Sequence, residues 1–555
     1  MGVKQGILQK LASLLLRQGK NIFSKVAGQN AKGPPVLHDG LDLGQREAVF
    51  QDLPLSTRLE ANLKLFQQVT GASYDINIKR FLSGPEKVPA ALLYIDGLVD
   101  AALLEGLLRA VKIDIFLTGI KDVQKKDILE TIRQRLLNIS ESQVAGDMKE
   151  LYYGVSMGRA ALLFDGTAQA LILETQGWKT RTITEPASEP AIRGIREGFI
   201  EDIRTNTALI RRRIRSPNLW IESLEIGSLG KAGVAFAYLK GLVAEDVLGE
   251  LRARLNNIDI DGVLGSGYVE EYITDNPNSL FPSVLSTERV DRVAGALLEG
   301  RVAVFVDGSS FALVVPADFN LFLQAPDDYF EPFPLGSLIR FLRYVSFFIA
   351  LFLPGVYVAI LTFHPELLPV SLLLRIQAAR EGVPFPVVVE TFFMEGVFEI
   401  LREAGVRLPM LVGPAISIVG ALVLGDAAIR AGIVSPGVVV IVAFTAIASF
   451  TAPVFSLGLA ARILRFIIII LGASFGLLGV QFGLLLILIH LVTLRSLGQP
   501  YMAPFAPFIW EDMKDALISL FRWQQVYRPK LLGYREPRRQ RPGQKPQPPP
   551  QKGEN

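Results

Sequence analysis

The charge pattern changes abruptly at Tyr344, and this change limits the folds open to the chain more than any other feature. No lysine follows Tyr344 until Lys514, and four runs in this region carry no charged residue: residues 344–363, 409–425, 433–461 and 466–492. Each run is near or above the roughly 20 residues that a helix needs to cross about 30 Å of hydrocarbon. The sequence therefore predicts a helical membrane domain over residues 338–497.

The composition shows that the rest of the chain belongs in water. Of the 555 residues, 50% are hydrophobic and 20% are charged, with a mean hydropathy of +0.35. This balance is too apolar for one ordinary soluble domain and too charged for a chain buried entirely in lipid. The net charge of +3 gives no general attraction to nucleic acid, so no nucleic-acid partner is expected.

Cysteine and histidine usage excludes several kinds of site. The chain has no cysteine and only three histidines. Disulfides, thiolate metal sites and a cysteine nucleophile are thereby excluded, and a histidine-rich metal centre is not expected. The sequence predicts neither a metal nor a cofactor.

Two sequence blocks recur in the part that precedes the apolar runs. Residues 94–100 (YIDGLVD) recur at 238–244 (YLKGLVA), 144 residues later, and residues 158–166 (GRAALLFDG) recur at 300–308 (GRVAVFVDG), 142 residues later. Two blocks at nearly one offset predict two copies of one small α/β unit. In each copy an Asp-Gly pair lies between apolar strands, which is a strong signal for a hairpin turn.

These features divide the chain into seven segments. The predicted fold class is a cytoplasmic tandem of two small α/β units followed by a multi-span helical membrane domain. The segments are a basic arm (1–44), a first α/β subdomain (45–195), a basic connector (196–231), a second α/β subdomain (232–330), the membrane domain (338–497), an amphipathic post-membrane segment (498–530) and a Pro-rich basic tail (531–555). The arm suits a helix on an anionic bilayer as well as a solvated tail, whereas the Pro-rich tail is expected to be disordered.

The four apolar runs predict an even number of crossings. Both ends of the chain are basic, and the positive-inside rule places basic ends on the cytoplasmic side. Residues 383–400 are accordingly expected to form a re-entrant or bundle-buried segment. Small residues in the last run predict close helix packing; they are Gly472, Gly476, Gly479 and Gly483.

No enzyme motif is present, since the sequence lacks a phosphate loop, a zinc-protease motif and a nucleophile elbow. What remains is an acidic row in which Glu395, Glu399 and Glu403 are spaced four apart, so that a helix places these three on one face. We expect a charged pore or vestibule that attracts cations, formed by Glu390, Glu395, Glu399 and Glu403. An alternative is that Glu399 and Glu403 pair with Arg402, Arg407 and the other arginines of residues 364–408 in an interfacial helix.

A second charged cluster lies in the connector. It consists of Arg211, Arg212, Arg213 and Arg215. Four arginines this close are suited to binding an anion or a partner, and they equally suit a solvated or salt-bridged helix face.

Several stretches resemble one family in order along the chain. They include residues 199–218 (FIEDIRTNTALIRRRIRSPN), 296–303 (ALLEGRVA), 380–386 (REGVPFP) and 399–409 (EILREAGVRLP). These stretches resemble the A-subunits of bacterial spore germination receptors, the GerA family, and the resemblance covers residues 45 to 530. Relatives encoded with dipicolinate-transport proteins belong to the same family, and these stretches do not separate the two groups.

The resemblance implies a multi-pass protein of the spore inner membrane, with its N-terminal domain facing the core or cytoplasm. It also implies a receptor that includes a B-subunit and a C-subunit, and a homo-oligomer, expected to be a pentamer. Such an assembly is expected to act as a nutrient-gated channel for monovalent cations that triggers germination. Because the family's nutrient recognition is attributed mainly to the B-subunit, no nutrient pocket is assigned to this chain.

Two other functions fit parts of the sequence. In an interaction scaffold, the α/β tandem would bind germination partners while the helices only anchor it, without a pore of its own. In a secondary transporter, the interrupted apolar runs would form a substrate site. The membrane part lacks the inverted repeat that a transporter would be expected to have.

Overall fold

A computed structural model describes residues 43–44, 46, 50, 53–83, 87–114, 142–177, 186, 189, 193–407, 425–532 and 536–547. Nearly all of the expected basic arm, most of the run 409–425 and the end of the tail lie outside these residues. The chain divides into two compact units. The first comprises residues 1–182, 202–224 and 235–242, and the second comprises residues 183–201, 225–234 and 243–555.

The first α/β subdomain is built on a five-stranded antiparallel sheet. Its strands are β1 (Ile76–Ser83), β2 (Val88–Ile95), β3 (Ser142–Ala145), β4 (Ala160–Phe164) and β5 (Ala170–Leu173), in the order β1-β2-β4-β5-β3. In the central pair, Leu92 of β2 lies opposite Leu162 of β4. The order places the two most apolar hairpin strands, β4 and β5, inside the sheet, where both faces are buried.

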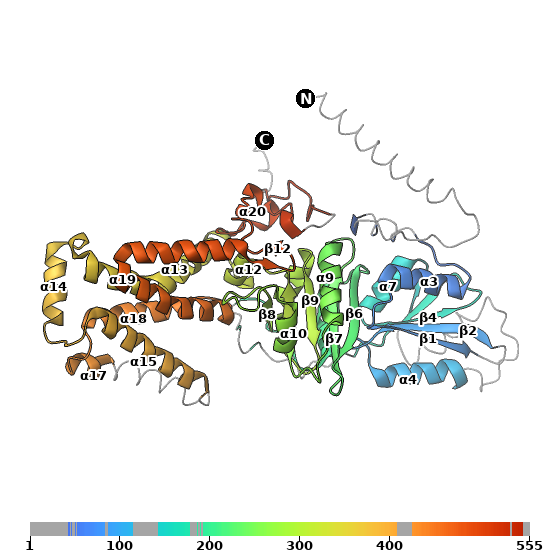
Figure 1. Cartoon of the computed structure of the whole chain (residues 1–555). Helices are drawn as coiled ribbons and strands as arrows, with labels where there is room; N and C mark the ends of the chain where they lie inside the picture. Colours follow the sequence, from blue (N-terminus) through green and yellow to red (C-terminus); the bar gives the residue numbers. More distant parts are fainter. Residues whose placement is uncertain are drawn as a thin grey trace, which may run out of the picture. The chain divides into compact units, whose positions relative to one another are not determined.

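Helices cover both faces of this sheet (Figure 1). Alternate residues of a strand point to opposite faces, so Leu93 of β2 packs toward α3 (Leu59–Thr70) and α7 (Met148–Ser156). Its neighbour Leu92 packs toward α4 (Ala101–Arg109) on the other face. The result is a three-layer α/β/α arrangement.

A second sheet repeats this topology. Its strands are β6 (Leu219–Ile226), β7 (Ala232–Leu239), β8 (Leu285–Thr287), β9 (Val302–Val306) and β10 (Ala312–Val315), in the order β6-β7-β9-β10-β8. This order matches that of the first sheet strand for strand, as the internal repeat predicts. Both Asp-Gly pairs lie between the expected strands, and Gly166 and Gly308 have φ values of 93° and 80°, which favour glycine.

The helices of the second unit follow in chain order. Three accompany the second sheet: α9 (Glu245–Asn256), α10 (Ser266–Ile273) and α11 (Val290–Leu298). The later ones are α12 (Phe319–Leu323), α13 (Phe333–Phe363), α14 (Val370–Arg380), α15 (Val387–Arg407), α17 (Gly425–Arg430), α18 (Pro436–Ser449), α19 (Phe455–Thr493) and α20 (Trp510–Met513). Among the described residues, α13 with 31 residues and α19 with 39 are long and apolar enough to cross a membrane.

The apolar run 433–461 does not form one helix, contrary to the expectation of a single span. α18 ends at Ser449 and α19 begins at Phe455. Pro453 lies in the gap; a proline disfavours helical geometry at the preceding residue and cannot donate a backbone hydrogen bond. The segment 383–400, expected to be re-entrant or bundle-buried, lies largely in the continuous 21-residue helix α15, whose Val387 and Met394 belong to a buried cluster.

The last apolar run is also interrupted, because the chain reverses at Gly476. This residue has φ 62° and ψ −146° within α19. A Cβ added at Gly483 would lie 2.4 Å from Cδ1 of Ile468, although 15 residues of continuous helix would separate them by about 22 Å. α19 therefore consists of two antiparallel arms, residues 455–475 and 477–493.

The glycines of this run allow the close packing that the sequence predicts. A Cβ at Gly472 would lie 2.6 Å from the carbonyl oxygen of Gly355 in α13, and one at Gly479 would lie 2.0 Å from the carbonyl oxygen of Leu471. Both obstacles are backbone atoms, which cannot rotate away. The small residues thus let backbones approach one another as helices in lipid commonly do.

We expect Gly479→Ala to destabilise the folded protein by about 1–3 kcal/mol, because the added methyl group overpacks the hairpin. The measurement is the unfolding midpoint of the purified protein in detergent micelles. Gly267→Ala in α10 is a matched control, since no atom lies within 4 Å of its added Cβ. Equal midpoints for the two variants would contradict the tight contact between the arms of α19.

The beginning of the Pro-rich tail is anchored, although the sequence predicts disorder from residue 531. Arg539 donates to Glu299 at 2.8 Å and to Gln525 at 3.2 Å. The Arg528 guanidinium donates to the backbone carbonyls of Glu536 and Arg538, both at 2.8 Å. Arginine hydrogen bonds, one ion pair and the buried Leu532 hold this part of the tail, and the low overall apolar content of the tail did not indicate these contacts.

Candidate functional site

The acidic row of the sequence lies on α15, within the apolar helices of the second unit. Glu390, in the first turn, is buried and accepts a hydrogen bond from Arg380 of α14 at 3.1 Å. Its other oxygen accepts from the backbone N–H of Ser435 at 2.7 Å. Ser435 precedes α18, so Glu390 also neutralises the positive end of that helix.

Glu395 forms the most buried ion pair of the row. Arg465, in the first arm of α19, donates from Nη1 to Oε2 of Glu395 at 2.6 Å. Arg465 also donates from Nε to the carbonyl oxygen of Ala350 in α13 at 2.6 Å. The two charged side chains are 0% and 1% exposed. One arginine therefore connects α13, α15 and α19 inside the apolar region.

Glu399, one turn later on α15, pairs with a second arginine of α19. Arg462 donates from Nη1 to Oε2 of Glu399 at 3.0 Å. The guanidinium of Arg402 lies 4.9 Å from the ring centre of Phe450 and 5.8 Å from that of Phe455, within the range of a cation–π contact. The alternative pairing predicted for Glu399, with Arg402 or Arg407, is thus replaced by a pair with α19.

The ion pairs leave part of their hydrogen-bonding capacity unused. Among the described residues, four buried atoms of the two pairs with α19 have no hydrogen-bond partner: Glu395 Oε1, Glu399 Oε1, Arg462 Nη2 and Arg465 Nη2. Unsatisfied polar groups at low dielectric are costly. The arrangement neutralises both carboxylates and leaves one acceptor oxygen on each without a hydrogen-bond partner.

The row extends to Glu403, which is exposed on the described part of α15. The arginine partners on α19 were not predicted from the sequence. The available signal was that Arg462 and Arg465 lie three residues apart between two uncharged runs, which places both on one helix face.

The arginine cluster of the connector is divided between interior and surface. α8 (Ile203–Arg213) carries its first three members. Arg211 is buried and makes a two-point ion pair with Asp75, at 2.7 and 3.0 Å. Arg213 and Arg215 are exposed. Arg211 is therefore a structural residue of the first unit, whereas an anion or partner contact at Arg213 and Arg215 stays a prediction.

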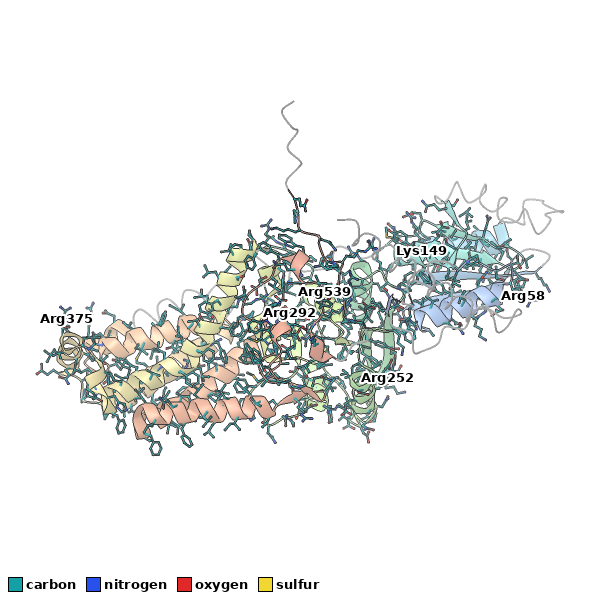
Figure 2. The ribbon with its side chains drawn as sticks, turned by 90° about the horizontal axis from the view of Figure 1, so that it is seen from above. Arg58, Lys149, Arg252, Arg292, Arg375 and Arg539 are labelled. Carbon is teal, nitrogen blue, oxygen red and sulfur yellow. The ribbon has the colours of Figure 1, made fainter. Side chains whose placement is uncertain are left out.

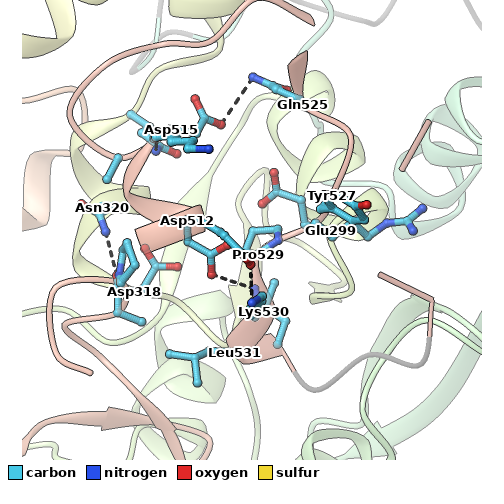
Figure 3. Close-up of a pocket in the computed structure, with 18 of the residues that line it drawn as sticks. Glu299, Asp318, Asn320, Asp512, Asp515, Gln525, Tyr527, Pro529, Lys530 and Leu531 are labelled. Atoms are coloured by element: carbon cyan, nitrogen blue, oxygen red, sulfur yellow. Dashed lines mark hydrogen bonds and ion pairs between the residues drawn. The ribbon is translucent and has the colours of Figure 1, made fainter. Parts of the chain in front are cut away.

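A cavity of about 340 Å³ lies in the second unit beside the post-membrane segment (Figure 3). Its charged lining residues largely bond one another: Arg301 pairs with Asp318 at 2.5 Å, Lys530 pairs with Glu511, and Glu299 pairs with Arg539. Burial alone would raise the pKa of Glu299, but Arg539 and Arg301 outweigh it and lower the value. Of these pairs, the one between Glu299 and Arg539 connects the second subdomain with the described part of the tail.

Charged side chains mark both ends of the helical region (Figure 2). Arg375 of α14 lies at one end, and Arg292 and Arg539 lie near the other. Within the part of the chain that the structure describes, no three His, Asp or Glu side chains are grouped so that they could hold a metal ion.

Glu270 of α10 should make folding depend on pH. Burial raises its pKa from 4.5 to about 7. Between these values the folded state retains a proton that the unfolded state has lost, so stability falls as pH rises. We expect a loss of about 2 kcal/mol between pH 5 and pH 8.

Thermal unfolding of the purified protein at the two pH values measures this effect, and Glu270→Gln should reduce it. Glu271→Gln, at the exposed neighbouring position, serves as the control. The prediction for Glu270 is wrong if both variants retain the pH dependence of the parent protein.

The fold and the site define a class: a protein with a duplicated α/β region and apolar helices that are suited to a bilayer and contain buried ion pairs. The family described as Bacillus/Clostridium GerA spore germination proteins matches residues 64–531. The chain belongs to this GerA family, as the resemblance predicts.

Individual relatives span most of the chain. This chain is 44% identical to spore germination protein KA of Bacillus subtilis (strain 168) over 496 residues, which cover 89% of this chain and 90% of the relative. It is 38% identical to spore germination protein B1 of the same organism over 474 residues, covering 84% and 96%.

Among solved structures, the chain is similar to the N-terminal domain of the A subunit of the Bacillus megaterium spore germinant receptor GerK3. The sequence identity is 36% and the TM-score is 0.39. The match covers 48% of this chain and 97% of the other.

Proposed function

We propose that this chain is a membrane subunit of a spore germinant receptor and that it oligomerises into a nutrient-gated cation channel. The proposal places it in the spore inner membrane with B- and C-subunits as partners and with the α/β tandem facing the core. Family membership and the relatives' names support a role in germination. The observation that carries the channel role is the row Glu390, Glu395 and Glu399, with each carboxylate bonded to an arginine among apolar helices.

Ionisable residues at bilayer depth are costly and commonly mark ion pathways. Here Arg465 and Arg462 occupy the carboxylates of Glu395 and Glu399, so no negative charge is left for a passing cation. We assign this arrangement to a closed state. Displacement of α19 from α15 would free both carboxylates, and partner subunits that bind a nutrient would shift the equilibrium between the two arrangements.

Conductance of the purified full-length protein in planar bilayers, alone and with its partner subunits, tests the proposal. We expect potassium current from the assembly. The double variant Glu395→Gln, Glu399→Gln should lower it by about tenfold, a change equivalent to about 1.4 kcal/mol. Glu366→Gln, at an exposed position outside α15, is the matched control. Unchanged current and selectivity in the double variant would refute the role of the row.

An interaction scaffold is the second candidate, favoured by the duplicated α/β region. Removal of residues 1–330 separates the two functions. Current from the remaining helical part supports the channel, whereas a silent helical part that still assembles with its partners supports the scaffold.

A further inference from the structure

The post-membrane segment is bonded to α13 just before the uncharged run of that helix begins. Arg340 of α13 donates to the side chain of Asp515 at 3.0 Å and to its carbonyl oxygen at 2.7 Å. Ser337 donates to the carbonyl oxygen of Ser519 at 3.2 Å. The uncharged run begins at Tyr344, about 6 Å further along the helix axis than Arg340. Residues 515–519 therefore lie close to the predicted boundary between water and lipid.

Buried ion pairs next to this contact fix the position of residues 515–519 along α13. Arg340 also donates to Asp328 at 3.1 Å, and Asp328 is bonded in turn by Arg343 at 2.6 Å. Burial raises the pKa of Asp515, although Arg340 acts in the opposite direction. Phe521 stacks on Phe333, the first residue of α13, with ring centres 4.4 Å apart.

Two large aromatic side chains project from the same segment. Phe508 and Trp510 are 65% and 70% exposed, and their ring centres are 6.2 Å apart. Only a few residues separate them from Asp515, and backbone bonds shape the loop: Ile509 donates to Pro504 at 3.0 Å and Met513 donates to Ile509 at 3.1 Å. An exposed aromatic pair in an ordered loop suggests an interaction surface.

α13 presents an exposed apolar face at this level. The residues are Leu335, Leu338, Phe341 and Leu342. They precede the uncharged run by no more than nine residues, or about 14 Å along the axis. Lipid-facing apolar side chains thus continue into the layer that contains the aromatic pair, and Trp is enriched at this depth in membrane proteins.

We propose that Phe508 and Trp510 insert into the headgroup layer of the bilayer and that residues 498–525 form an interfacial anchor for the second unit. The partner is the lipid boundary itself, because α13 fixes the depth of the segment. The inference rests on α13 crossing the bilayer, which is part of the proposed function.

The absence of cysteine makes a depth measurement direct. Single variants Phe508→Cys and Trp510→Cys, labelled with the fluorophore NBD, are reconstituted as full-length protein in mixed phosphatidylcholine–phosphatidylglycerol vesicles. We expect lipids with a shallow nitroxide to quench both labels by about twofold or more, and aqueous iodide to quench them weakly, as for interfacial side chains.

Two further labels keep the outcomes distinct. Leu229→Cys, at a position 83% exposed in the loop between β6 and β7, is expected to be quenched by iodide only. Ile470→Cys, at an exposed position in α19, is expected to be quenched by a deep nitroxide. Two results would overturn the inference while the label at 470 is still quenched by the deep nitroxide. In one, iodide quenches the labels at 508 and 510; in the other, neither quencher reaches them because protein covers them. An Ile470 label in water would overturn the membrane-spanning role itself.

Discussion

Replacement of Arg465 by methionine should destabilise the helical region by about 3–5 kcal/mol, because it leaves the buried carboxylate of Glu395 without a cation. The variant also removes the donor to the carbonyl oxygen of Ala350, so contacts of α19 with both α13 and α15 are lost. We expect a large drop in the unfolding midpoint in detergent micelles, followed by circular dichroism.

Two variants test the physical cause of this loss. The double variant Glu395→Leu, Arg465→Met removes both charges, and we expect it to regain most of the stability, as buried pairs replaced by apolar residues often do. Arg430→Ala breaks an exposed pair with Asp426 at 2.8 Å, which should cost at most about 0.5 kcal/mol. If Arg465→Met lowered the stability no more than Arg430→Ala does, the buried ion pair between Arg465 and Glu395 would be contradicted.

The duplicated α/β architecture could be predicted because its signals are local. The second pair of repeated blocks contains an apolar strand, the first pair begins at the end of one, and the Asp-Gly pairs determine where the hairpins turn. Their spacing recurs along the chain, so the second sheet has the same strand order as the first. The predicted second subdomain (232–330) contains four strands of its sheet, whereas β6 lies within the predicted connector (196–231).

The helical region was harder to predict. Hydropathy gives the length of an apolar run, but it does not show whether the chain continues in one direction along that run. Pro453 and Gly476 were visible in the sequence, yet both lie in uncharged runs that hydropathy alone treats as continuous. A reversal at Gly476 requires that Gly479 and Gly483 meet Leu471 and Ile468 across the turn. This contact depends on three-dimensional packing rather than on composition.

The partners of the acidic row could not be predicted from spacing. Four-residue spacing places Glu395 and Glu399 on one helix face, but it does not identify the neighbouring helix. Arg465 lies 70 residues from Glu395 in the sequence. Only the packing of α19 against α15 brings them together, so the sequence predicted a charged row and the structure provides its counter-charges.

The second large effect is expected in the first unit, at Arg211. Its guanidinium bonds Asp75 through two nitrogens and donates to Ser73 at 2.8 Å. Burial disfavours the charged form, but Asp75 and Tyr152 outweigh it and raise the pKa of Arg211. The arginine therefore stays charged at any pH at which the protein is folded.

We expect Arg211→Met to destabilise the first unit by about 3–5 kcal/mol, because the carboxylate of Asp75 stays buried without its cation. Hydrogen exchange of the full-length protein, read by mass spectrometry, should show faster exchange in β1 and α8, which carry or adjoin the two residues. Arg215→Ala, at an exposed position, should leave exchange in both elements unchanged. Equal exchange in the two variants would mean that Arg211 contributes no more to the stability of the first unit than a surface arginine does.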